Sequence, residues 1–154
     1  MGKGNCSKES LVTQPAIRFF DSAYSIRRIG EGLLAATLPK AEWTHEAHLA
    51  ACTWLLIERA DVAIEAELPA IISRYNLSVG GVNDDSQGYH ETLTQLYIRG
   101  VRDFLARSDQ RELLAAVNAL LASEMAQRDW PLRFYSGERL FSVAARRGWV
   151  APDL

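Results

Sequence analysis

The feature that most constrains this chain is the recurrence of apolar residues every three or four positions, which is the spacing of one face of an α-helix. One such stripe runs through His90, Thr94, Tyr97, Val101 and Phe104. Several other stretches show the same spacing, and no stretch alternates apolar and polar residues for long enough to suggest a strand. The pattern predicts an all-α protein.

Helix-boundary residues divide the chain into about six helices. We expect a first helix from near Pro15, a second capped by Thr44, and a third capped by Asp61 and kinked or split at Pro69. The later helices are expected from about Tyr89, from Ser108 or Asp109, and from Ser136 to Gly148. The fold class predicted is a single-domain helical bundle over residues 15–154, following a polar tail at 1–14 and with one long loop at 76–88. The residues expected in its core are Leu55, Leu56, Tyr97, Val101, Phe104, Leu114, Val117 and Leu121.

Composition narrows the functional classes. The 154 residues suffice for one buried core, and the net charge of −2 gives no electrostatic basis for binding nucleic acid. No apolar run approaches the roughly 20 residues of a membrane span. The two cysteines, Cys6 and Cys52, do not form a disulfide framework, so we expect a cytoplasmic protein.

The three histidines are the first candidate site. His45 and His48 lie one helical turn apart on one face of the second helix, and His90 begins another helix after the long loop. If these helix ends are neighbours, three imidazoles converge and can hold zinc or nickel, leaving one position open for an activated water. Glu46 or Glu91 would then serve as the catalytic carboxylate.

Two other interpretations of the histidines remain open. They can line a metal-free ligand or catalytic pocket together with Trp43, Tyr89 and Tyr97, or they can be structural, with the aromatic residues in the core. Arg133 and Arg139, helped by Arg146, form a second candidate site for an anionic ligand; the alternative is a solvated arginine face held by ion pairs. No serine-nucleophile, phosphate-loop or His-Glu-x-x-His motif is present.

Three segments, Trp-Thr-His-Glu-Ala-His-Leu, Gly-Tyr-His-Glu-Thr-Leu-Thr and Tyr-Ser-Gly-Glu-Arg-Leu-Phe-Ser-Val-Ala-Ala-Arg, resemble an uncharacterised family of small bacterial proteins. The resemblance extends from about residue 38 to the end and implies no chemistry. The chain is also similar to DinB-like helical bundles, which hold a divalent metal with three histidines. His45, His48 and His90 match their number, whereas the order and spacing differ.

These observations lead to two functional expectations. The first is a small metal-dependent enzyme, hydrolytic or lytic, with a histidine-lined pocket at one end of the bundle. The alternative is a non-catalytic protein that binds a small molecule or assembles with a partner, its histidines being structural. Arginine-rich and apolar surface is also compatible with a homodimer.

Overall fold

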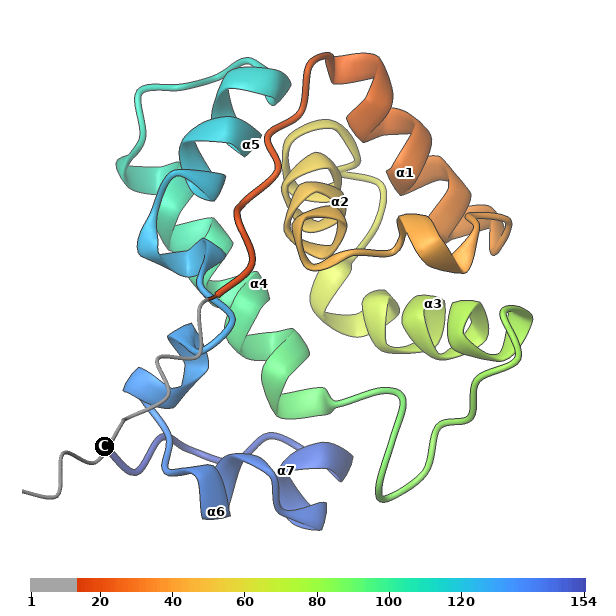
Figure 1. Ribbon diagram of the computed structural model, residues 1–154, viewed down its shortest axis with the longest axis vertical. Helices are drawn as coiled ribbons and strands as arrows, with labels where there is room; N and C mark the ends of the chain where they lie inside the picture. Colours follow the sequence, from red (N-terminus) through yellow and green to blue (C-terminus); the bar gives the residue numbers. More distant parts are fainter. Residues whose placement is uncertain (1–13) are drawn as a thin grey trace, which may run out of the picture.

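A computed structural model describes residues 14–154, and in this range the chain is helical and contains no strand, so the predicted all-α class is confirmed (Figure 1). The expected polar tail lies outside the described residues except for Gln14. No helix in the described range is long and apolar enough to cross a membrane. The helices are α1 (Ala23–Ala35), α2 (His45–Glu58), α3 (Ile64–Ser78), α4 (Glu91–Arg107), α5 (Leu113–Leu121), α6 (Gly137–Leu140) and α7 (Val143–Arg147), with the short 3-10 helices η1 (Lys40–Glu42), η2 (Glu124–Ala126) and η3 (Trp130–Arg133).

Helix α2 is the central element, and α1, α4 and α5 pack around it (Figure 1). Its side chains are buried without interruption from Leu49 to Leu55, although we expected a single inward face. A helix that is apolar on all sides is stable only where neighbours surround it. The small residues Ala47, Ala50 and Ala51 allow those neighbours to approach closely. Thr44 caps α2 as predicted, its hydroxyl accepting a hydrogen bond from the Ala47 amide at 3.2 Å.

The first helix begins at Ala23, so the prediction of a start near Pro15 is wrong. The preceding residues are extended and cross between α2 and α5 (Figure 1). Asn118 of α5 holds them by accepting from the Phe20 amide at 3.0 Å and donating to the Phe20 carbonyl at 2.9 Å. An extended segment cannot satisfy its own backbone groups, so this side chain takes the place of helical hydrogen bonds.

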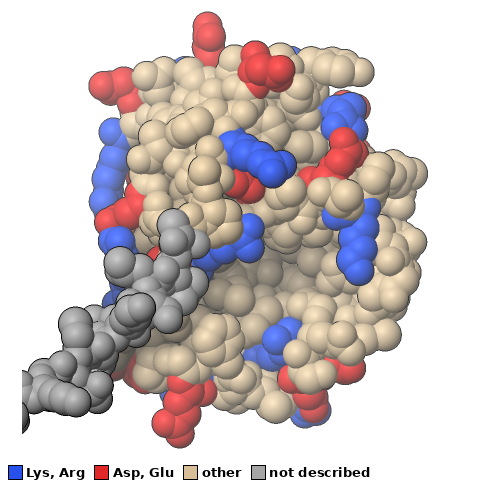
Figure 2. All heavy atoms as spheres, viewed as in Figure 1, with Lys and Arg blue, Asp and Glu red and all other residues tan. Residues whose placement is uncertain are grey.

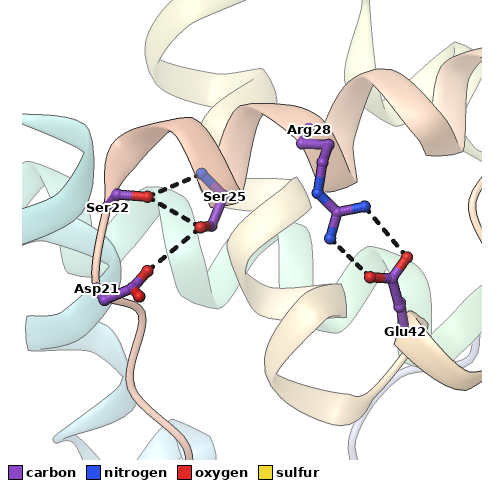
Figure 3. Close-up of polar contacts among 5 residues, drawn as sticks. All are labelled: Asp21, Ser22, Ser25, Arg28 and Glu42. Carbon is purple, nitrogen blue, oxygen red and sulfur yellow. Dashed lines mark hydrogen bonds and ion pairs between the residues drawn. The ribbon is translucent and has the colours of Figure 1, made fainter.

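Helix α1 is capped by Ser22, whose hydroxyl accepts from the Ser25 amide (Figure 3). Further along the helix, Arg28 makes a two-pronged ion pair with Glu42 of η1, with distances of 2.7 and 3.1 Å (Figure 3). These contacts orient the turn that leads into Trp43 and the start of α2.

Helix α3 contains Pro69 and nevertheless continues from Ile64 to Ser78 as one helix, so of the two predicted effects of Pro69 the split does not occur. Proline lacks the amide hydrogen that would bond to the Glu65 carbonyl one turn earlier. Gln95 of α4 supplies that hydrogen bond instead, with its side-chain nitrogen 3.0 Å from the Glu65 oxygen. The residue in the cap position before Ile64 is Ala63 rather than the predicted Asp61, whose carboxylate pairs with Arg59.

Two later boundaries also differ from expectation. The long loop covers residues 79–90, because α3 continues to Ser78, and α5 is preceded by Glu112 rather than by Ser108 or Asp109. Ser136 caps α6 as predicted, and Ser142 begins a separate α7. Of the expected core, Leu55, Val101, Val117 and Leu121 are buried, and the other four residues are partly buried against the core.

Candidate functional site

A cavity of about 670 Å³ opens between α2, α3, α4 and the 79–90 loop. Figure 2 shows this face hollowed near its centre, with Lys and Arg side chains around the hollow. His45 and His48 from α2 line the cavity together with His90 from the start of α4. The structure therefore brings the three histidines to one cavity, as a shared site requires. Trp43, Tyr89 and Tyr97 line it as well, and aliphatic side chains complete the wall: Leu33, Leu49, Leu68, Ile72, Leu93 and Ile98.

The His48 imidazole is oriented by its neighbours and open to solvent. Its Nδ1 lies 2.5 Å from the Thr44 carbonyl oxygen, which can only accept, so Nδ1 carries the hydrogen. Trp43 stacks on the ring at a centroid distance of 3.9 Å. The opposite nitrogen, Nε2, therefore has a free lone pair and no hydrogen bond to any residue from 14 to 154.

The surroundings favour the neutral form of His48. Desolvation by the cavity walls is the main cause that lowers its pKa, to about 4, and the charges of His45 and Arg128 act in the same direction. The Thr44 carbonyl opposes them. The His48 imidazole is therefore neutral at pH 7.

His45 is half-buried, and its Nε2 is a buried atom without a hydrogen-bond partner in the described range. Burial lowers the pKa of His45 first, the charge of Arg128 lowers it further, and a backbone interaction with Ala126 partly offsets both. The ring meets Tyr97 edge-on at 6.1 Å between centroids. This imidazole is held in the wall as a neutral group.

His90 has a structural role. Its Nδ1 accepts from the Leu93 amide at 3.2 Å and so caps α4. Its Nε2 must then carry the hydrogen, which it donates to the Leu140 carbonyl 2.9 Å away. Both ring nitrogens are thus engaged, and no lone pair of His90 is left for a metal. Across residues 14–154, no group of three His, Cys, Asp or Glu side chains is placed to hold a metal ion.

The two predicted catalytic carboxylates, Glu46 and Glu91, are engaged by residues outside the cavity or at its edge. Glu46 is buried against the N-terminal segment, where it accepts from the Arg18 amide at 3.3 Å. Glu91 accepts from the Tyr89 hydroxyl at 2.5 Å, and burial is the main cause that raises the pKa of Tyr89. Neither glutamate lines the cavity. Tyr89 does, as the sequence suggested.

The arginines of the second predicted site do not converge. Arg133 pairs with Glu124, and Arg139 donates to the Ala151 carbonyl at 2.6 Å. Arg146 donates to the carbonyls of Gly88 and Tyr89, so it fastens the 79–90 loop to α7. These contacts fit the alternative of an arginine surface held by local partners.

Sequence reasoning missed the one permanently charged residue that lines the cavity in the described range, Arg128. Arg128 lies between η2 and η3, in a segment without helical periodicity, so no sequence signal pointed to it. Tyr97 and Cys52 also line the cavity, although their positions on apolar stripes favour packing over a pocket role. The Tyr97 hydroxyl stays neutral, since burial raises its pKa to about 12.

The fold and the cavity define a class: an all-helical domain with a histidine-lined, largely apolar cavity at the N-terminal ends of two helices. No protein-family model, curated protein or solved structure matches the chain.

Proposed function

We propose that the cavity binds a small organic molecule and that His48 acts on it as a general base without a metal. The geometry of His48 is the observation that carries this proposal. Its Nδ1 hydrogen is held by the Thr44 carbonyl, and Trp43 fixes the ring plane. A neutral imidazole whose second nitrogen is free is the group most often used for proton transfer in enzymes.

Other chemistries find less support among the side chains of the cavity. Cys52 is buried, and desolvation raises the pKa of its thiol to about 12, so it does not supply a thiolate nucleophile. A three-histidine metal site would need a lone pair that His90 uses to cap α4. The reaction class that remains is proton abstraction from a bound molecule, or activation of water by His48.

Thermal-shift screening of small organic compounds, followed by NMR observation of the binders over time, tests the proposal. We expect at least one compound to raise the melting temperature and to be converted in the presence of EDTA. Because general-base catalysis contributes roughly 10²–10⁴-fold, His48→Gln should lower turnover by about that factor while binding persists. A matched His45→Gln variant should retain most of the turnover.

Three results would contradict the proposal. Turnover that is unchanged in His48→Gln would show that His48 is not the general base. Turnover that EDTA abolishes and zinc or nickel restores would support the metal-dependent interpretation instead. If no compound binds, the cavity is not a ligand site.

A second candidate function is binding without catalysis. It is favoured by one observation: no Asp or Glu lines the cavity in the described part of the chain, so His48 has no carboxylate partner to assist proton transfer. Compounds that bind wild type and the His48→Gln variant equally, with no conversion by either, would establish this function. For either function we propose a cytoplasmic location, because the buried Cys52 is a free thiol.

A further inference from the structure

The cavity wall has an unbalanced charge. Arg128 is its only residue of permanent charge in the described range, and no acidic side chain lines it. The α2 helix also starts in this wall, at Thr44 and His45, and the N-terminal end of a helix carries partial positive charge. Electrostatics inside the cavity therefore favour an anion.

Arg128 is available for such an anion. Its main-chain amide donates to the Gln14 side chain at 3.3 Å, but its guanidinium has no hydrogen bond or ion pair with residues 14–154. Six other arginines pair with carboxylates: Arg27, Arg28, Arg59, Arg102, Arg133 and Arg147. Arg128 lines the same cavity as His45 and His48, and its positive charge contributes to lowering the pKa of both imidazoles.

The other residues of the cavity wall would contact the apolar part of a ligand. Trp43 and Tyr97 present aromatic surface, and Leu49, Leu68 and Ile72 present aliphatic surface. A volume of about 670 Å³ lies within the range of small-molecule sites, which are mostly apolar with a few polar groups that orient the ligand.

We propose that the ligand is a small organic carboxylate with an aromatic or branched aliphatic body, whose anionic group is bound by Arg128. The inference rests on the proposed function of the cavity. A single guanidinium matches a carboxylate, with which it forms two parallel hydrogen bonds. The apolar body then lies against Trp43 and Tyr97, and the free Nε2 of His48 is close to the end of the molecule that carries the carboxylate.

Calorimetric titration with matched acids and amides tests the inference. The probes are benzoate and benzamide, and indole-3-acetate and indole-3-acetamide, at pH 7.5. We expect each acid to bind wild type at least about tenfold more tightly than its amide, a difference of about 1.4 kcal/mol. Arg128→Gln should reduce this ratio to near one without weakening amide binding, and Arg128→Lys should keep part of it.

Arg133→Gln is the matched control, because Arg133 is an arginine of the same region that pairs with Glu124 outside the cavity. Its acid-to-amide ratio should equal that of wild type. Arg128→Gln should melt close to the wild-type temperature, since the Arg128 side chain makes no bond to the described residues. Arg133→Gln should do so as well, because it removes only an exposed ion pair.

The outcomes separate this inference from the proposed function. If acids and amides bind wild type equally, the carboxylate preference is wrong while the ligand cavity stands. If Arg133→Gln rather than Arg128→Gln removes the preference, the anion site is elsewhere. Tighter binding of phenyl phosphate than of benzoate would assign the site to phosphate esters. If no acid or amide binds, both the inference and the proposed ligand cavity are contradicted.

Discussion

At the scale of single residues, three histidines of identical chemistry have different roles because their neighbours differ. His90 uses both nitrogens to join α4 to the Leu140 carbonyl, 50 positions along the chain. Among the contacts of residues 14–154, His48 uses one nitrogen and leaves the other free, and the Nε2 of His45 is buried without a partner. Position in the fold, rather than residue type, distinguishes a structural imidazole from one that can react.

Replacing His90 should therefore destabilise the protein. His90→Ala removes a helix cap and leaves a buried carbonyl unpaired, so we expect the free energy of unfolding to fall by about 2–3 kcal/mol. His90→Asn should recover about 1 kcal/mol, because asparagine can cap α4 but cannot reach Leu140. Urea denaturation of the two variants measures this difference. Equal losses would show that the cap contributes nothing.

At the scale of elements, close contacts between helices decide what the local sequence permits. A Cβ at Gly30 of α1 would lie 2.1 Å from the Trp54 ring of α2, so only glycine allows this approach. Within α3, Pro69 is tolerated because Gln95 reaches across from α4. In both cases, a contact with a neighbouring helix explains a residue that is unfavourable in the interior of an isolated helix.

Gly30→Ala should destabilise the protein even though alanine favours helix formation. The gain in helix propensity is about 1 kcal/mol, and overpacking against the buried Trp54 costs about 1–3 kcal/mol or more, so we expect a net loss. Gly137→Ala is the control, since its added Cβ would meet nothing closer than 4.0 Å. Thermal denaturation should show a lower midpoint for Gly30→Ala alone.

Gln95→Leu should leave the Glu65 carbonyl without its donor and cost about 1–3 kcal/mol. Adding Pro69→Ala to that variant restores an amide hydrogen at position 69, which can bond to Glu65 within the helix. We therefore expect the second substitution to recover most of the lost stability in urea denaturation. If the double variant is no more stable than Gln95→Leu, Gln95 does not compensate for the amide hydrogen that Pro69 lacks.

At the scale of the whole molecule, the cavity exists because segments distant in sequence meet around α2. The C-terminal helix α7 contributes by holding the 79–90 loop, through Arg146 and through the ion pair of Arg147 with Asp85 at 2.6 Å. This loop supplies Gly88 and Tyr89 to the wall. The site is therefore a product of the entire fold, from the second helix to the last.

The three histidines should make the stability of the whole molecule depend on pH. All three have pKa values below the ordinary 6.5, so the unfolded chain binds more protons than the folded one as pH falls through that value. The free energy of unfolding should thus decrease from pH 7 to pH 5, above the range in which carboxylates titrate. Urea denaturation at pH 7, 6 and 5 measures it, and His48→Gln should flatten the curve. A free energy of unfolding that rises toward pH 5 would show that the pKa values of these histidines are not lowered in the folded protein.

Several features were predictable because they depend on residues close in sequence. The helical class follows from apolar spacing, and the caps Thr44 and Ser136 follow from hydroxyls three residues before the amides they satisfy. The placement of His45 and His48 at one cavity also follows, because the two residues lie one helical turn apart. Each of these interactions spans four residues or fewer, so the sequence alone determines it.

Tertiary structure decided the rest, because the partners lie far apart along the chain. The extended segment before α1 depends on Asn118, the continuity of α3 through Pro69 depends on Gln95, and the role of His90 depends on Leu140. Arg128 joins the cavity without any sequence signal. Periodicity identifies which residues face inward, whereas only packing determines which distant groups satisfy their hydrogen bonds and which nitrogen remains free.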